Sequence, residues 1–214
     1  MGPQKVFGIG FHKTATTSLA AALTQLGYRV TGPNWRKNPR IAQEVHALAY
    51  DCVPKFDAFQ DNPWPLLYRE LDPKFPGSKF ILTLRPADRW IRSVVDHFGG
   101  STTPMREWIY GSGCGDPAGR EKLYVERYER HNREVLQYFA ERPDDFLVLK
   151  ITEGEGWEKL CPFLGVPMMP GAFPKTNSAR DRKGLRRFAN RLLMALNLRF
   201  NLQRTKAEAA KPAR

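Results

Sequence analysis

Cysteine is scarce in this chain of 214 residues, which contains only Cys52, Cys114 and Cys161. An odd and widely spaced set of this kind provides neither a complete disulfide framework nor the paired spacing of a structural zinc site. We therefore expect free thiols and no bound metal. Because free thiols persist in reducing compartments, the cysteine content predicts a cytoplasmic protein.

Long apolar runs are missing as well. Lys5 and His12 interrupt the apolar residues near the N-terminus, whereas a signal peptide or a membrane-spanning helix needs an unbroken apolar stretch. Neither is expected here. Charged residues make up 26% and hydrophobic residues 42% of the chain, which is typical of a globular protein with a substantial core.

Acidic residues are outnumbered, and the imbalance lies mainly in one place. The net charge is +12, and residues 181–214 hold ten lysines and arginines against two acidic residues, a net +8. A basic segment alone favours nucleic acid, acidic lipid or another polyanion. Since no zinc finger, RNA-recognition motif or helix-turn-helix pattern is present, we expect no nucleic-acid partner.

A Walker A motif is also absent, because no Gly-Lys pair exists around Lys13. The N-terminal segment nevertheless has the layout that binds phosphate. The apolar run at 6–9 predicts a buried strand that stops at Gly10, and a helix begins near Thr16. Strand, tight loop and helix together direct backbone N–H groups and the positive end of a helix dipole at an anion.

The loop after this strand adds side chains suited to an anion. Lys13 supplies a positive charge, and the hydroxyl groups that follow it belong to Thr14, Thr16, Thr17 and Ser18. A second interpretation stays open, because threonine and serine are also common helix N-caps without any ligand.

Lys13-Thr-Ala-Thr-Thr17 resembles the loop that binds the 5′-phosphosulfate in sulfotransferases that use PAPS (3′-phosphoadenosine-5′-phosphosulfate). The resemblance implies that the cofactor contacts fall on His12, Lys13, Thr14, Ala15, Thr16, Thr17 and Ser18. Ala15 stands where the family pattern has glycine, so the backbone must avoid a positive φ there or bear its cost.

Along the rest of the chain, apolar strands alternate with amphipathic helices. This alternation indicates a three-layer α/β fold with a central, mostly parallel sheet, and the resemblance implies a P-loop NTPase-like version of it. Strands are expected at 6–9, 28–30, 57–62, 79–84 and 146–149, and helices from 16, at 41–50, from about 65, from 87, at 121–141, at 155–164 and at 185–204.

Three polar clusters follow expected strands: residues 10–18, 60–62 and 85–93. Because ligands of such folds bind at the carboxyl ends of strands, we expect these clusters to converge. In the third cluster, Arg85 ends a buried strand and Ser93 lies two turns into the next helix. An arginine fork and a hydroxyl suit one phosphate, and this spacing resembles the element that holds the cofactor's 3′-phosphate in PAPS sulfotransferases.

The two motifs together predict a PAPS-dependent sulfotransferase that releases 3′,5′-ADP and needs no metal. Arg182-Lys183-Gly184 resembles a third cofactor element of the family, with Asn177, Ser178 and Arg180 as competing candidates in the same loop. Two alternatives remain open: a P-loop kinase for nucleotides or small molecules, and a non-catalytic protein that binds polyanions or membranes. The acceptor is expected to be a small molecule, glycan or lipid, and nothing in the sequence indicates the oligomeric state.

Sulfonyl transfer needs a base for the acceptor's proton and a positive charge for the leaving phosphate. The resemblance assigns the second role to Lys13. Asp61, at the end of an expected strand, is the first candidate for the base, although it is also a common type of turn residue. His12 and His97 are further candidates near the cofactor, whereas His46 and His131 are expected on helix surfaces.

Three segments make up the expected domain organisation. Residues 1–184 form the sulfotransferase-like domain, 185–204 a basic helix packed on it, and 205–214 a flexible tail. The basic helix has an apolar stripe, so packing on the domain competes with peripheral contact to an anionic membrane.

Overall fold

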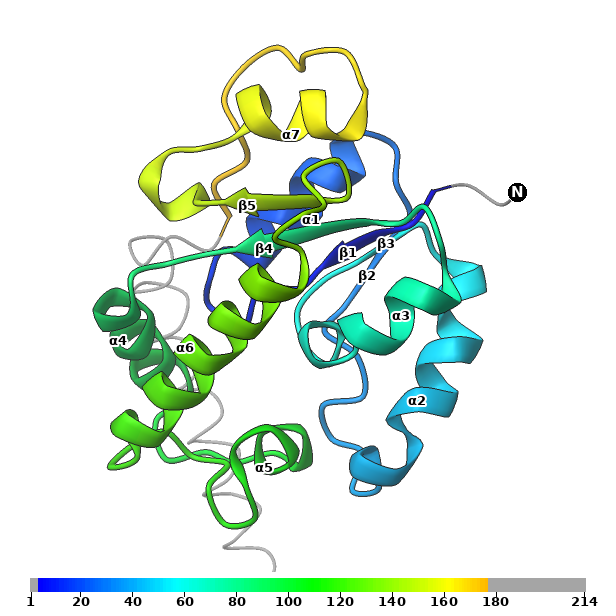
Figure 1. Cartoon of the computed structure of the whole chain (residues 1–214). Helices are drawn as coiled ribbons and strands as arrows, with labels where there is room; N and C mark the ends of the chain where they lie inside the picture. Colours follow the sequence, from blue (N-terminus) through cyan, green and yellow to red (C-terminus); the bar gives the residue numbers. More distant parts are fainter. Residues whose placement is uncertain (1–3, 177–214) are drawn as a thin grey trace, which may run out of the picture. The chain divides into compact units, whose positions relative to one another are not determined.

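The computed structural model describes residues 4–176. The expected contents of the remaining C-terminal part, namely the Arg182-Lys183-Gly184 triplet, the helix at 185–204 and the tail at 205–214, lie outside the described residues. The described part contains five strands and seven α-helices, and a helix follows every strand (Figure 1). They are β1 Val6–Gly8, α1 Thr16–Gln25, β2 Val30–Thr31, α2 Ile41–Cys52, β3 Ala58–Phe59, α3 Tyr68–Lys74, β4 Lys79–Thr83, α4 Ala87–Phe98, α5 Pro104–Tyr110, α6 Glu121–Tyr138, β5 Phe146–Leu149 and α7 Trp157–Leu164. Short 3-10 helices occur at η1 Val53–Lys55, η2 Trp64–Leu66 and η3 Ile151–Glu153.

The five strands form one parallel sheet in the order β2-β3-β1-β4-β5. The register pairs Phe7 of β1 with Phe59 on one side and with Phe80 on the other. The α/β fold with a parallel sheet is thus confirmed. Because β1 lies between β3 and β4, the loop that follows β1 sits beside the carboxyl ends of both neighbouring strands.

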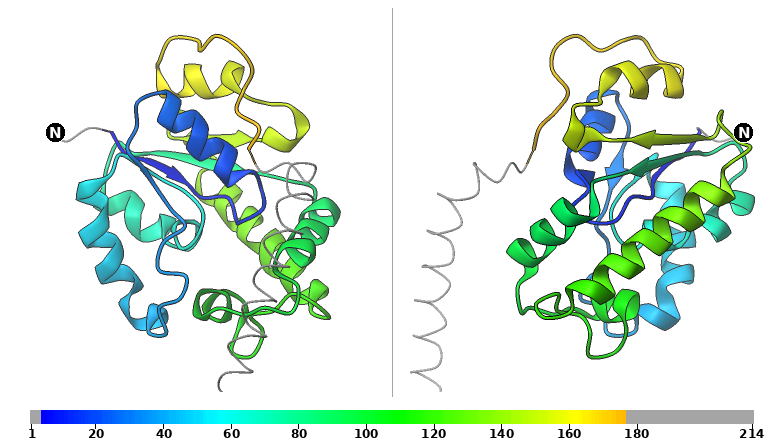
Figure 2. Two further views of the ribbon diagram at one scale, coloured as in Figure 1. Left: turned by 180° about the vertical axis from the view of Figure 1, so that it is seen from behind. Right: turned by 60° about the vertical axis from the view of Figure 1, so that its left-hand side comes forward.

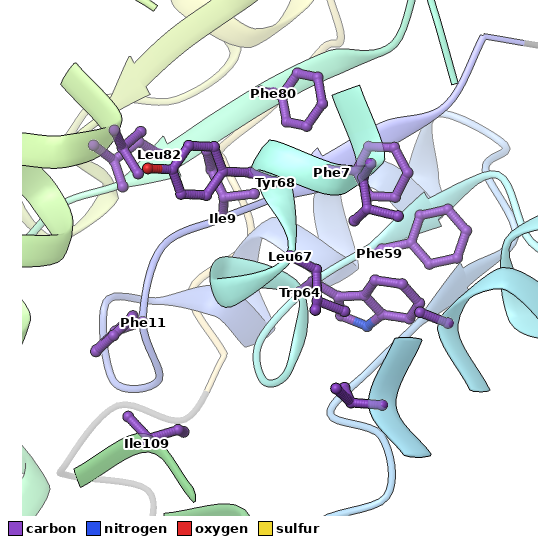
Figure 3. Close-up of a cluster of buried hydrophobic side chains, with 14 of the residues drawn as sticks. Phe7, Ile9, Phe11, Phe59, Trp64, Leu67, Tyr68, Phe80, Leu82 and Ile109 are labelled. Carbon is purple, nitrogen blue, oxygen red and sulfur yellow. The ribbon is translucent and has the colours of Figure 1, made fainter. Parts of the chain in front are cut away.

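Helices cover both faces of the sheet, so the fold has three layers (Figure 1, Figure 2). Successive strand residues point to opposite faces. Val6, Ala58 and Ile81 pack with α1 and α7, while Phe7, Phe59 and Phe80 pack with helices of the other face. Figure 3 shows the aromatic side chains on the face of the sheet that carries Phe7, Phe59 and Phe80. The rings of Phe7 and Phe59 stack there with centroids 4.9 Å apart.

Two elements differ from the expectation. The strand at 146–149, which its apolar residues predict to be buried, is an edge strand whose first three residues are only partly buried. Helix α5 was not predicted at all. Its start carries a recognisable signal, because Thr103 caps it by accepting from the Arg106 N–H at 3.2 Å and Pro104 occupies its first turn.

No helix among residues 4–176 is long and apolar enough to cross a membrane.

Candidate functional site

The loop between β1 and α1 is fixed to the end of β4. The hydroxyl of Thr14 lies 2.6 Å from the carbonyl oxygen of Phe11 and 2.6 Å from the hydroxyl of Thr83. Gly10 makes this approach possible, because a Cβ there would lie 2.0 Å from the Thr83 Oγ1. Thr14 is fully buried, and its hydroxyl holds the loop to the end of β4.

Two residues of this loop adopt left-handed backbone conformations: Lys13 has φ 68° and Ala15 has φ 75°. Left-handed residues alternating with ordinary ones turn successive N–H groups toward one side and form a concave anion site. Ala15 also precedes the first residue of α1, where the helix leaves N–H groups without internal acceptors. The loop therefore has the backbone shape of a phosphate cradle.

Ala15 bears the conformational cost that the sequence indicated. Replacing it with glycine should raise the free energy of unfolding by about 1 kcal/mol, because glycine adopts the left-handed region without strain. Ala20, inside α1, offers a matched control: there the same replacement should lower stability by roughly 0.5–1 kcal/mol. Urea unfolding of both variants tests this, and a loss of stability in Ala15→Gly would show that Ala15 is not strained.

Asp61 lies at the end of β3 and meets the loop directly. Its Oδ2 accepts from the Thr16 hydroxyl at 2.9 Å, and its Oδ1 accepts from the Asn62 N–H at 2.7 Å. Burial raises the pKa of this carboxyl, while those two hydrogen bonds and the charges of Arg36 and Lys13 act in the opposite direction. Asp61 also has a left-handed backbone, with φ 62°. A carboxylate with a raised pKa close to a lysine is suited to accept a proton.

Arg85 brings the end of β4 to the same place. Its Nη1 donates to the carbonyl oxygen of Lys13 at 3.2 Å. Its backbone is held by the Tyr128 hydroxyl of α6, which accepts from the Arg85 N–H at 3.1 Å and donates to the Arg85 carbonyl at 2.8 Å. Ser93 lies on α4 and is partly exposed. The structure thus brings Lys13, Asp61 and Arg85 together from the ends of three adjacent strands.

His12, the residue before Lys13, connects the loop to three other segments of the chain. Its ring is buried, with Nδ1 3.0 Å from the Asn62 Nδ2 and Nε2 3.2 Å from the Tyr110 hydroxyl, and its carbonyl accepts from the Trp90 indole at 2.8 Å. Because the Asn62 amide donates to Nδ1, the proton of the neutral ring belongs on Nε2. Burial lowers the pKa of His12 to about 3. His12 therefore positions the loop from beneath.

The other predicted site residues are placed as follows. Ser18 is buried, and its Oγ accepts from the Thr176 N–H at 3.2 Å, whereas Thr17 is exposed. His97 lies in the last turn of α4, near enough to His12 for its charge to lower the pKa of that ring. Among residues 4–176, no group of three or more His, Cys, Asp or Glu side chains is arranged to hold a metal ion.

His131 was placed on a helix surface by the sequence, and that prediction was wrong. Only 1% of the residue is exposed, and its Nε2 donates to the carbonyl oxygen of Ile9 at 2.8 Å. Burial lowers the pKa of His131 to about 4. His46, by contrast, is exposed on α2 as expected.

The two buried histidines should make the fold sensitive to acid. Their pKa values fall to about 3 for His12 and about 4 for His131, so the unfolded chain takes up protons near pH 6.5 before the native protein does. Stability is therefore lost as the pH falls from about 6.5 toward 3. Between pH 7.5 and 5.5 each histidine should contribute roughly 1 kcal/mol of this loss. Urea unfolding at both pH values should show a smaller loss in His131→Gln and an unchanged loss in His46→Gln. An unchanged loss in His131→Gln would contradict the assignment.

Sequence reasoning missed the supports of the site: Asn62, Thr83, Trp90, Tyr110 and Tyr128. Each is buried and reaches the loop or its neighbours from an element distant in sequence. Asn62 lies within one of the predicted polar clusters, which was its only signal. The aromatic residues looked like ordinary core, because a phenol or indole that donates one hydrogen bond has the same sequence pattern as one that only packs.

The loop, a lysine, a carboxylate and an arginine at adjoining strand ends are residue types suited to an anionic group. Comparison with protein families shows that the chain belongs to the sulfotransferase domain family, which matches residues 5–112 and 98–182. It is accordingly a sulfonyl transferase. The sequence has no match among curated proteins.

Proposed function

We propose that this protein transfers the sulfonyl group of PAPS to a hydroxyl or amine acceptor and releases 3′,5′-ADP. The observation that supports this most is the meeting of three strand ends: the Lys13 carbonyl accepts from Arg85, and the Asp61 carboxylate accepts from Thr16 of the same loop. PAPS has two anionic groups, the 5′-phosphosulfate and the 3′-phosphate. The chain offers hydrogen-bond donors for each: the N–H groups of the loop for the first and the Arg85 guanidinium for the second.

The residues present fit such a donor. The left-handed backbone at Lys13 and Ala15 and the start of α1 supply N–H groups for a phosphosulfate. The guanidinium of Arg85 has the fork geometry that pairs with phosphate. We assign Arg85, with Ser93 on the following helix, to the 3′-phosphate. Arg182-Lys183-Gly184 remains part of the proposal as a further contact to that phosphate.

When bound, PAPS supplies an activated sulfonyl group on a phosphate leaving group. Lys13 offsets the negative charge that develops on that phosphate, which stabilises the transition state electrostatically. Asp61 accepts the acceptor's proton at its carboxylate, and its raised pKa brings it closer to the range useful for a base at neutral pH. His12 fixes the position of the loop at Lys13 through its hydrogen bond with Asn62. His97 is the second candidate for proton transfer.

Two other functions make different predictions. A kinase would consume ATP with magnesium, and a polyanion- or membrane-binding protein would bind through residues 185–204 without turnover. A cytoplasmic location remains a proposal that rests on the free thiols. The acceptor is proposed to be a small molecule, a glycan or a lipid.

Calorimetric titration with 3′,5′-ADP tests the donor directly. Micromolar binding of 3′,5′-ADP is expected, with ATP and magnesium binding at least about tenfold more weakly, since only 3′,5′-ADP has a 3′-phosphate.

Arg85→Gln should weaken the binding of 3′,5′-ADP by at least about tenfold, which corresponds to the loss of a charge-assisted pair. Arg89→Gln, on the exposed side of α4, is the matched control and should bind normally. Tighter binding of ATP would favour the kinase, and equal binding by Arg85→Gln would remove Arg85 from the site.

A further inference from the structure

A series of contacts between buried residues connects the end of α5 to the Asp61 carboxylate. The Tyr110 hydroxyl lies 3.2 Å from Nε2 of His12, and Nδ1 of the same ring lies 3.0 Å from Nδ2 of Asn62. The backbone N–H of Asn62 in turn donates to Oδ1 of Asp61 at 2.7 Å. Helix α5, the loop after β1 and the end of β3, three segments distant in sequence, therefore meet at this carboxylate.

The side-chain contacts of this series have no substitutes within residues 4–176. The contact with His12 is the only hydrogen bond of the Asn62 side chain there, because its Oδ1 is buried without a partner. His12, Asn62 and Tyr110 are only 3%, 5% and 6% exposed, which leaves water little access to a lost contact. The Asn62 carbonyl is held separately, since it accepts from the Asn34 N–H at 2.9 Å. Loss of the Tyr110 hydroxyl would thus displace Asn62 in part.

The last contact of the series acts on the proton affinity of Asp61. Burial raises the pKa of this carboxyl, and the hydrogen bonds from the Asn62 N–H and the Thr16 hydroxyl oppose that rise. The positive charges that also oppose it belong to Arg36 and Lys13. A displaced Asn62 N–H would stabilise the ionised carboxyl less, so the pKa of Asp61 would rise further.

Tyr110 acts through these contacts and not through a charge of its own. Burial raises the pKa of Tyr110 well above its ordinary value, so the phenol is neutral. The charges that act on His12 belong to Arg106, Lys13 and His97. Replacing Tyr110 with phenylalanine alters none of these charges. A change at Asp61 in that variant must therefore be transmitted through the His12 ring.

We propose that Tyr110 is a positioning residue: through the His12 ring and the Asn62 side chain it fixes the backbone N–H that holds the Asp61 carboxylate. Without the hydroxyl, the N–H at Nε2 of His12 loses its acceptor in a buried place, which favours a turn of the ring away from Asn62. The role of Asp61 as the base rests on the proposed function. The connection from Tyr110 to Asp61 does not.

Titration of the Asp61 carboxyl by carbon NMR tests this connection in the full chain without any ligand, and Asp61→Asn assigns the signal. Tyr110→Phe should raise the midpoint by about 0.5 pH unit, a roughly threefold change in proton affinity. Tyr124→Phe is the matched control and should keep the wild-type midpoint. Its ring stacks on that of Tyr110 with centroids 3.6 Å apart, but its hydroxyl donates to the Cys114 carbonyl at 3.2 Å.

The rate of sulfonyl transfer provides a second readout. In Tyr110→Phe the rise of the rate with pH should move upward together with the Asp61 midpoint, while the plateau at higher pH stays within about twofold of the wild type. A merely structural role would lower the plateau and leave the rise at its wild-type pH.

Asn62→Ala tests the series from its other end, because alanine keeps the backbone N–H but not the contact with His12. It should raise the Asp61 midpoint by a similar amount, and the double variant with Tyr110→Phe should show no further rise, since the two changes act in series. A wild-type midpoint in either single variant, or additive shifts in the double variant, would overturn the proposal. If the midpoint shifts but the wild type transfers no sulfonyl group, the proposed function fails and the positioning of Asp61 stands.

Discussion

Replacing Lys13 with alanine should lower the rate of sulfonyl transfer by at least about 100-fold while the protein stays folded. The Lys13 side chain is the positive charge of the loop, and it lies close enough to Asp61 to oppose the rise in pKa that burial causes there. Removing it leaves the developing charge on the phosphate without its main compensation. The backbone hydrogen bonds of the loop are unaffected, and alanine already occupies a left-handed position two residues away. The thermal midpoint should therefore change little.

The measurement is release of 3′,5′-ADP from PAPS with a panel of hydroxyl and amine acceptors. Lys122→Ala provides a control, since that lysine is exposed at the start of α6. A normal rate in Lys13→Ala would show that the lysine takes no part in the chemistry. A lower rate accompanied by unfolding would place its role in stability.

Asp61→Asn should lower activity by about 100-fold or more. Asparagine keeps one oxygen for the Thr16 hydroxyl, turns its amide NH2 toward the Asn62 N–H, and cannot take up a proton. Burial raises the pKa of Asp61, so above that pKa its charge is held unfavourably in the native protein. The native state binds more protons than the unfolded chain between the ordinary and the raised pKa, and stability declines as the pH rises through this interval. The variant should lack this decline.

The pH profile separates the two effects. Wild-type activity should rise with pH through the raised pKa of Asp61 and then level off. Asp51→Asn, exposed on α2, should retain both the activity and the profile. If Asp61→Asn keeps the wild-type rate, the base is another group, and His97 becomes the candidate to replace next.

The strands and their polar ends were predictable because each carries a local signal. Two general rules were enough to predict them: parallel strands are buried on both faces, and ligands bind at their carboxyl ends. The apolar run of β4 is followed by Arg85, and that of β1 is followed by Gly10. The predicted convergence of the three clusters follows from the sheet order, in which β1 lies between β3 and β4.

The supports of the site could not be predicted in the same way. Thr14 and Ser18 looked like ligand donors, yet their hydroxyls pair with Thr83 and Thr176, partners 69 and 158 residues away. His131 looked like a surface residue because the polar pattern of α6 does not reveal that Ile9 offers it a carbonyl. Long-range pairing of buried polar groups leaves no local periodicity, and that is why the sequence did not reveal these partners or the burial of His131.

The contact between Trp90 and the loop also provides a spectroscopic reporter. The chain has five tryptophans, and their indole N–H groups give separate signals in a nitrogen-correlated spectrum. That of Trp90 donates to the carbonyl of His12 at 2.8 Å, next to Lys13, whereas that of Trp157 is buried with no hydrogen-bond partner among residues 4–176. The Trp90 resonance, assigned through Trp90→Phe, would respond to any ligand that moves the loop. Occupancy can thus be followed in the native chain before an acceptor is known.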